Sequence, residues 1–191
     1  APGRGGAVSG MGSLGAGQMT ATSDLDLIVI YDAGGVEMTE GRRPLDPRGW
    51  FAQATKALVT ALSAPTAAGK LYEVDMRLRP SGRQGPVATA LAAFERYQRE
   101  EAWTWEHMAL TRARVVAGDI EAIRCAVIER AAAAEGIAAD AGAMRARLAA
   151  AGRTGGTWAV KEGPGGAQDI DLVAQAGALI AGSDARAPAA Q

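Results

Sequence analysis

Two aspartates at the start of an apolar run have the types and spacing that could do chemistry. Asp24 and Asp26 are two residues apart, and the apolar run continues to Tyr31. Because side chains alternate faces along a strand, both carboxylates are predicted to point the same way, about 7 Å apart. Carboxylate oxygens in this arrangement suit Mg²⁺, which shares its other ligand positions with phosphates. The pattern therefore indicates phosphoryl or nucleotidyl transfer.

A third carboxylate, Asp75, lies in a second predicted strand that spans residues 70–78. If the two strands are neighbours in one sheet, Asp24, Asp26 and Asp75 converge. Three carboxylates can hold two Mg²⁺ ions, one on a triphosphate and one that activates an attacking hydroxyl. The alternative stays open that Asp24 only opens a strand and Asp75 is a surface residue, because an Asp-x-Asp pair is a weak signal.

A glycine-rich turn is predicted over residues 12–17, shortly before the first aspartate. The hydroxyl of Ser13 and the backbone N–H groups after Gly12 could hold the terminal phosphates of a nucleotide. No Gly-Lys-Ser/Thr follows, so the turn is not a P-loop, and the dinucleotide-binding Gly-x-Gly-x-x-Gly fingerprint is also absent from this context. A tight turn between two strands is the structural alternative.

Two arginines share the predicted strand face of Asp75. Arg77 and Arg79 offer bidentate donors that suit phosphate oxygens. Ion pairing with Glu73 and Asp75 is the alternative.

Three further groups of residues have weaker signals. Arg112 and Arg114 accompany Glu106 and the single histidine, which is interpreted as a packed or exposed helix residue rather than a base. Trp103 and Trp105 are expected in the core or at an interface. Lys161 precedes a glycine pair and Asp169, where either an anion site or a simple loop before a helix is possible. The single histidine is His107, and the glycine pair is Gly165 and Gly166.

The elements that must position these side chains follow from hydrophobic periodicity. A strand is predicted over residues 7–11, a short helix could begin in residues 18–23, and a strand covers residues 24–31. A long loop then leads to a helix over residues 50–63 that ends before Pro65. Helical patterns follow over residues 87–116, over 120–151 with a break near Gly136, and over 169–180. The expected fold class is α+β.

Composition limits the class of protein. The chain has 191 residues, 48% of them hydrophobic, and a net charge of −1, which argues against a general nucleic-acid binder. The single cysteine, Cys125, cannot form an internal disulfide, so a reducing compartment such as the cytoplasm is expected. Neither a signal peptide nor a membrane-spanning run is visible. Because the chain starts without Met and soon reaches a strand, we expect a piece of a longer protein.

Taken together, these motifs resemble a known superfamily. The glycine–serine pair, the Asp-Leu-Asp at residues 24–26 and the later Asp75 are similar to polymerase β-like nucleotidyltransferases. The longer strings at residues 71–82, 97–119 and 161–171 resemble the glutamine synthetase adenylyltransferase/adenylyl-removing enzyme family. The resemblance covers residues 11–175.

The resemblance implies a fold, a reaction and partners. It implies a polymerase β-like nucleotidyltransferase sheet with flanking helices over residues 1–119, followed over 120–191 by the start of an all-helical region. Full-length members hold two such units, one that adds AMP from ATP to a tyrosine of glutamine synthetase and one that removes it by phosphorolysis. By resemblance, Asp24, Asp26 and Asp75 hold Mg²⁺, and a PII-type nitrogen signal protein is a possible partner of the full-length enzyme.

The strings at residues 73–75 and 101–107 look more like the C-terminal, adenylylating unit. The chain departs from the family pattern at three places. Ser13 stands where many members have Lys, Asp171 stands where the family usually has Glu, and the first ten residues are rich in glycine. The removing reaction, or a non-catalytic module that binds a partner, remains an alternative.

Overall fold

The sheet has two long antiparallel strands at its centre and short strands at both edges. The computed structural model describes residues 5–67, 69–70, 72–151, 160–161 and 163–183. Within these, strand order is β3-β2-β1-β5, and β4 also pairs with β2. Strands β3 and β4 pair in parallel with the start and the end of β2, respectively. The strands are β1 (Gly5–Gly10), β2 (Leu25–Asp32), β3 (Val74–Asp75), β4 (Thr89–Ala90) and β5 (Arg114–Ala117).

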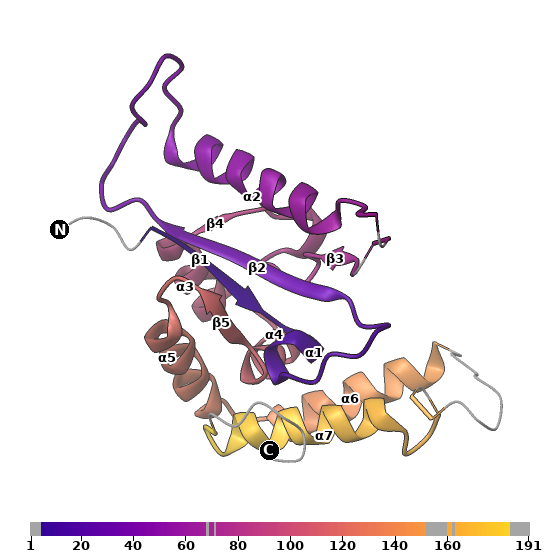
Figure 1. The fold of residues 1–191 in the computed structure, drawn as a ribbon. Helices are drawn as coiled ribbons and strands as arrows, with labels where there is room; N and C mark the ends of the chain where they lie inside the picture. Colours follow the sequence, from indigo (N-terminus) through magenta and orange to yellow (C-terminus); the bar gives the residue numbers. More distant parts are fainter. Residues whose placement is uncertain (1–4, 68, 71, 152–159, 162, 184–191) are drawn as a thin grey trace.

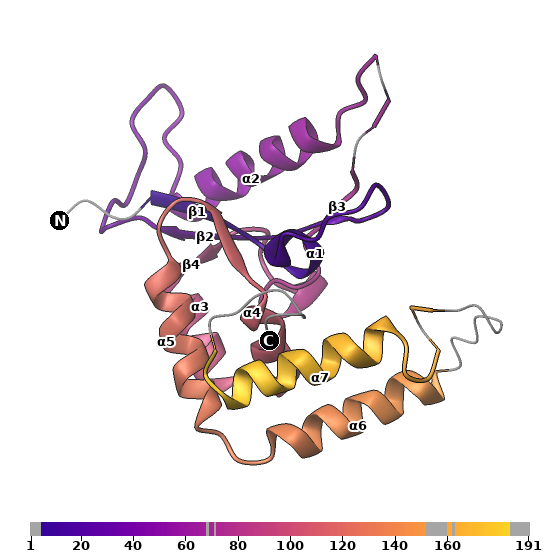
Figure 2. The same ribbon diagram turned by 60° about the horizontal axis from the view of Figure 1, so that its bottom comes forward.

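Helices cover both faces of this sheet. Helix α2 lies on one face, and α3, α4 and α5 lie on the other, with α6 and α7 beyond α4 (Figures 1 and 2). The fold is therefore α+β, as predicted. The helices are α1 (Gly12–Ala16), α2 (Pro47–Ser63), α3 (Leu91–Glu100), α4 (Thr104–Thr111), α5 (Glu121–Ala132), α6 (Ile137–Ala150) and α7 (Ala167–Ile180), with a 3₁₀ turn at Gly82–Gln84.

Strand β2 supplies apolar side chains to both faces. Ile28 and Ile30 belong to the large core on the side of α3 and α4. Val29 and Tyr31 belong to a smaller cluster on the side of α2, where the Tyr31 ring stacks on Phe51 with the ring centroids 4.3 Å apart. This alternation is the strand period of two. Asp26 shares the parity of Ile28, which places its side chain on the face of the large core.

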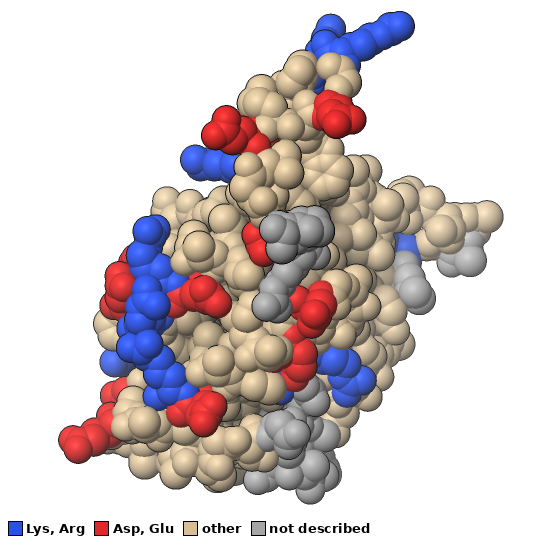
Figure 3. Space-filling model, turned by 90° about the vertical axis from the view of Figure 1, so that its left-hand side faces the viewer, with Lys and Arg blue, Asp and Glu red and all other residues tan. Residues whose placement is uncertain are grey.

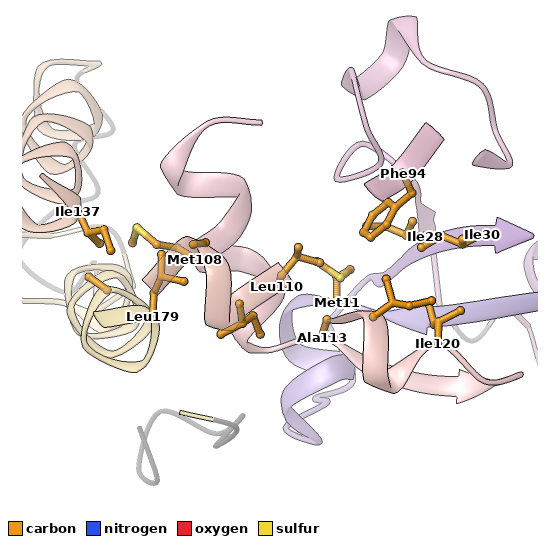
Figure 4. Close-up of a cluster of buried hydrophobic side chains, with 14 of the residues drawn as sticks. Met11, Ile28, Ile30, Phe94, Met108, Leu110, Ala113, Ile120, Ile137 and Leu179 are labelled. Carbon is orange, nitrogen blue, oxygen red and sulfur yellow. The ribbon is translucent and has the colours of Figure 1, made fainter. Parts of the chain in front are cut away.

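The large core runs without interruption from the sheet to the last two helices. Figure 4 shows Ile28, Ile30 and Phe94 at one end, Leu110 in the middle, and Met108, Ile137 and Leu179 at the other end. Buried residues of the predicted catalytic part and of the predicted helical part form a single cluster. The residues on either side of position 119 therefore share one hydrophobic core.

Several predicted elements are confirmed. The first strand forms and pairs with β2 along its whole length, despite its glycines. Helix α2 starts three residues earlier than predicted, because the Asp46 side chain accepts a hydrogen bond from Gly49 N at 2.6 Å and Pro47 occupies the first turn. The loop of residues 33–46 is an excursion that extends away from the sheet (Figure 1). The break near Gly136 and the last helix are also present.

The predicted strand over residues 70–78 is wrong in length, although its residue 71 lies outside the described part. Only Val74 and Asp75 pair with β2. The strand ends there because the N–H of Arg77 donates to the Asp75 carboxylate at 2.7 Å instead of continuing a ladder. The chain then turns through residues 77–80.

The continuous helix predicted over residues 87–116 is also wrong. Two residues form β4, α3 ends at Glu100, and α4 begins only at Thr104. The Glu106 carboxylate accepts the N–H of Trp103 at 2.9 Å and so starts the second helix separately. Residues 114–117 pair with β1 as an edge strand, which the short Arg-Val-Val-Ala run did not reveal.

The region before β2 differs from the prediction in two ways. Residues 12–16 form one short helix, α1, closed by Gly17 in the left-handed conformation, rather than a simple turn. Residues 18–23 form no helix; the hydroxyl of Ser23 accepts the N–H of Thr20 at 2.9 Å and closes a polar loop.

The surface carries both charges. On the face drawn in Figure 3, Lys and Arg side chains are interspersed with Asp and Glu side chains. Among the described residues, no helix is long and apolar enough to cross a membrane.

Candidate active site

The start of β2 brings the predicted carboxylates together. Asp26 and Asp75 are direct partners in the parallel pairing of β2 with β3, and Leu25 is the partner of Val74. Asp24 is exposed and comes immediately before β2. The backbone reinforces this pairing, since Leu25 N donates to Glu73 O at 2.7 Å. The predicted neighbouring of the two strands is thus confirmed for Asp26 and Asp75, and Asp24 comes just before the paired residues.

The charges of Asp75 and Asp24 act on Asp26. The pKa of Asp26 is raised from 3.8 to about 6, mainly because burial disfavours the ionised form, and further by the negative charges of Asp75 and Asp24. The positive charges of Arg77 and Arg112 oppose this rise. Asp26 is thus a partly buried acid whose negative charge is poorly compensated.

Asp75 is compensated by its neighbour. The Arg77 N–H donates to Asp75 Oδ1 at 2.7 Å, and Arg77 Nε donates to Asp75 Oδ2 at 2.5 Å. A second guanidinium nitrogen of Arg77 also contacts Asp75 Oδ2. Burial would raise the pKa of the Asp75 carboxyl, but these bonds hold it below its ordinary value. The Arg77 side chain is 62% exposed, so this cation covers the third carboxylate from the solvent side.

Gly12 lies against the Asp26 carboxylate. Met11 N donates to Asp26 O at 2.8 Å, which fixes the entry of α1 beside the start of β2. Gly12 has φ +51°, and a Cβ there would lie only 2.5 Å from Asp26 Oδ2. A side chain at position 12 would therefore meet the Asp26 carboxylate. Ser13, half-buried, is the next residue of α1.

Arg79 is not directed at this group of residues. Its guanidinium donates to the backbone oxygens of Met76 at 2.7 Å, Gly85 at 3.1 Å and Arg83 at 3.3 Å. These bonds hold the loop after β3 in shape. Of the two predicted phosphate-binding arginines, Arg77 lies at the carboxylates and Arg79 supports the loop behind it.

A residue that the sequence did not assign to the site lies beside it. Arg112 follows α4, is 7% exposed, and has a charge that acts on Asp26. Its Nη1 contacts Asp171 Oδ2 of α7 at 3.0 Å. The sequence placed Arg112 only in a group with Arg114, Glu106 and His107. No spacing in the sequence signals a contact among α4, α7 and β2.

The residues at this edge have the donor chemistry for Mg²⁺ but do not form a ready ligand set. In the described part of the chain, no three His, Cys, Asp or Glu side chains are arranged to hold a metal ion. Burial, and after it the negative charges of Asp75 and Asp24, raise the pKa of Asp26, and a bound cation would favour its ionised form. Carboxylate oxygens are the ligands that Mg²⁺ prefers. The residues fit the ion in type, provided that Arg77 releases Asp75.

The weaker candidates have structural partners. The Asp169 carboxylate accepts from Gly165 N and from Arg145 Nη2, both at 2.8 Å. Hydrogen bonds to Arg145 and Gly165 lower the pKa of Asp169. Backbone N–H groups at the start of α7 are used in backbone bonds: Gly166 N donates to Gly163 O at 2.8 Å, and Gln168 N donates to Lys161 O at 3.0 Å. These hydrogen bonds account for the conformation of the loop without a bound anion.

The histidine and the tryptophans lie away from the carboxylates in the chain fold. His107 Nε2 is 2.9 Å from Gln98 O, so the ring is packed against α3. Trp103 and Trp105 are 68% and 39% exposed, which excludes the core as their environment. They line a cavity of about 480 Å³ with residues of α6.

The comparisons of this chain with known proteins all point to the same family. The sequence model of the family described as glutamate-ammonia ligase adenylyltransferase (GlnE) matches residues 2–126. The chain is similar to proteins named bifunctional glutamine synthetase adenylyltransferase/adenylyl-removing enzyme. It is 51% identical over 177 residues to that of Xanthobacter autotrophicus, which covers 88% of this chain and 18% of the relative.

Two further relatives with the same name are similar over nearly all of the chain. The protein of Mesorhizobium japonicum is 46% identical over 195 residues, covering 97% of this chain and 20% of the relative. The protein of Rhizobium meliloti is 48% identical over 182 residues, covering 92% and 18%. The chain thus spans about a fifth of the length of these relatives.

Proposed function

We propose that this chain, which belongs to the glutamate-ammonia ligase adenylyltransferase family, transfers AMP from ATP to a tyrosine of glutamine synthetase. The single observation that carries the proposal is the register that makes Asp26 the partner of Asp75, with Gly12 against the Asp26 carboxylate. The carboxylates lie beside the glycine-rich start of α1, and this arrangement suits a nucleoside triphosphate and its metal ions. The relatives' printed names supply the acceptor protein.

Each residue of the site has a proposed role. Asp24 and Asp26 hold Mg²⁺, and Asp75 completes the ligand set. Ser13 and the amides after Gly12 hold the β- and γ-phosphates. When bound, Mg²⁺ supplies charge neutralisation of the triphosphate and lowers the pKa of the acceptor hydroxyl.

Arg77 has a proposed role that follows from its present contact. Its exposed guanidinium covers Asp75, and phosphate oxygens are an equally good bidentate acceptor. Binding of the triphosphate would draw Arg77 from Asp75 to the phosphates and free that carboxylate. Arg79 would contribute indirectly, because it holds the loop that carries Arg77.

The chemical step is an in-line displacement. The tyrosine oxygen bonds to the α-phosphorus, the bond from that phosphorus to the bridging oxygen breaks, and pyrophosphate leaves with its electron pair. Asp75, once free of Arg77, takes the proton of the hydroxyl. The rate enhancement comes mainly from positioning and charge stabilisation.

Replacement of the first two carboxylates tests this proposal. Asp24→Asn and Asp26→Asn should each abolish AMP transfer from labelled ATP to glutamine synthetase, because the metal-holding oxygens are lost. Both variants should keep the circular dichroism spectrum of the native fold. Survival of AMP transfer in folded Asp26→Asn would overturn the metal assignment. An exposed-carboxylate control, Glu129→Gln on α5, should transfer AMP at the wild-type rate.

The removing reaction is the second candidate, because the relatives' names include both activities. In that reaction phosphate attacks the AMP-bearing phosphorus, and ADP and free tyrosine leave. Incubation of adenylylated glutamine synthetase with the chain and phosphate should yield no ADP if addition is its role. ADP formation without AMP transfer would assign the removing reaction instead. Failure to bind Mg–ATP in calorimetry would favour a non-catalytic module.

The cellular setting belongs to the same proposal. An adenylylating enzyme of glutamine synthetase would work in the cytoplasm, where that enzyme meets ATP. Regulation by a PII-type nitrogen signal protein would act through the full-length enzyme. Co-purification of full-length enzyme with such a protein would test this partner.

A further inference from the structure

We propose that Arg112 and Asp171 form a positioning pair that makes α7 a part of the nucleotide site, by holding the start of α1 and the carboxylate end of β2 in place. The inference rests on the proposed function, because it assigns these residues to the same site. It concerns Asp171, whose role neither the sequence nor the family description specifies. Arg112 acts through its neighbours and contacts no reacting atom in this proposal.

The first step is the side chain of Arg112. It is 7% exposed, and among the described residues its Nε has no hydrogen-bond partner. A contact of 3.0 Å joins its Nη1 to Asp171 Oδ2. A buried guanidinium with a single carboxylate partner is oriented by that partner, because loss of the carboxylate would leave the charge uncompensated. Asp171 therefore determines where the Arg112 guanidinium lies.

The second step is the contact between the backbone of Arg112 and α1. A Cβ at Gly15 would lie 2.1 Å from Arg112 O and 2.6 Å from Gly10 O. Helix α1 is thus in direct contact with the main chain at position 112, with no side chain between them. A shift of Arg112 would move Gly15, and with it the Ser13 turn two residues earlier.

The third step is the charge of Arg112 at the carboxylates. Its positive charge acts on Asp26, against the combined negative charges of Asp24 and Asp75. The pair therefore links α7, through the side chain of Arg112, to α1, which the backbone of Arg112 contacts at Gly15. Asp171 is 39% exposed in its side chain, so it can be replaced without opening the core.

The test is calorimetric titration of Mg–ATP into the whole chain and into its variants. Asp171→Asn should raise the Kd for Mg–ATP about tenfold, because Arg112 loses its orientation. Asp171→Glu should restore most of the affinity, since it keeps the charge. Arg112→Gln should weaken binding to a similar extent, and the double variant should bind no worse than either single variant, because both changes break the same pair.

A matched ion pair on the same helix provides the control. Asp169 binds Arg145 at 2.8 Å, two residues before Asp171, on the exposed side of α6 and α7. Asp169→Asn should lower the melting temperature less than Asp171→Asn, because its partner Arg145 is exposed, and should leave the Kd for Mg–ATP within twofold of wild type. This comparison separates the loss of any α7 ion pair from the loss of this one.

Two results would overturn the inference. One is an Mg–ATP affinity of Asp171→Asn that stays within twofold of wild type. The other is additive losses in Arg112→Gln and Asp171→Asn. If Arg112→Gln does not fold, Asp171→Asn and Asp171→Glu still decide the question. A wild-type chain that binds no Mg–ATP would instead defeat the proposed function, and this inference with it.

Discussion

The ionised form of Asp26 is disfavoured in the folded state, and the position that disfavours it is the one that suits a bound cation. Burial and two neighbouring aspartates oppose its ionisation, and its pKa rises to about 6. A carboxyl whose folded pKa lies above its unfolded value lowers the free energy of unfolding. The loss grows as the pH rises from the unfolded pKa to the folded pKa and is complete above the folded pKa. Well below pH 3.8 both states are protonated and the cost vanishes.

Asp26→Asn should therefore stabilise the metal-free chain at pH 7 by about 1 to 2 kcal/mol, allowing for screening of the part that solvent reaches. The gain should be absent at about pH 2, well below both pKa values, and grow as the pH rises to 6, because only wild type ionises at this position. Urea denaturation in EDTA at a series of pH values measures this difference. A gain that stays constant with pH would contradict the prediction. Glu129→Gln, at an exposed carboxylate, should show no such gain.

At the scale of the elements, α1 shows how a helix start is fixed by close approach. Its glycines allow the backbone to touch neighbouring chain segments where a side chain would not fit. Gly15 faces backbone oxygens at 2.1 and 2.6 Å from the position of an added Cβ, whereas Gly142 in α6 has nothing within 4 Å. The same substitution should therefore have opposite effects at these two glycines.

Gly15→Ala should destabilise the chain by about 2 kcal/mol or more, because rigid backbone must move. It should also weaken Mg–ATP binding, since α1 carries Ser13. Gly142→Ala should stabilise the chain by about 0.5 to 1 kcal/mol, as alanine loses less conformational freedom in a helix. Thermal unfolding followed by circular dichroism compares the two variants. An equal change in melting temperature for both would disprove this account of α1.

Regular elements were predictable from the sequence, and pairings between distant segments were not. The alternation in β2 and the apolar spacing of α2, α5, α6 and α7 are local signals. The shortness of β3 depends on the Arg77 N–H turning to Asp75, and β5 forms only because β1 offers it an edge. Arg112 contacts Asp171 of α7 and its charge acts on Asp26 of β2, so no local pattern could mark it.

At the scale of the whole molecule, one core connects the sheet to the last helices. Leu179 of α7 is fully buried in the cluster that also contains Ile28 of β2 and Met108 of α4 (Figure 4). The sequence-based division at residue 119 therefore does not mark two separate cores. A substitution in the buried face of α7 should therefore also destabilise the sheet.

Leu179→Ala should destabilise the chain by about 3 kcal/mol, through lost burial and the cavity that remains. Circular dichroism and tryptophan fluorescence should report one shared unfolding transition at a lower temperature. Two separated transitions would show that the helical part unfolds independently. Ile180→Ala, at a neighbouring side chain that is 53% exposed, should shift the melting temperature far less.

The brevity of β3 has a kinetic consequence. Among the described residues, two residues of β3 pair with β2 at the outer edge of the sheet, and one further backbone bond joins Leu25 to Glu73, while β1 pairs with β2 along its whole length. Local opening of so short a strand costs much less than global unfolding. We therefore expect Asp75 to leave and rejoin the other carboxylates while the central strands stay paired. A site with one carboxylate on such a hinge has a low-energy route for release of a bulky, highly charged product, the step that limits turnover in many enzymes.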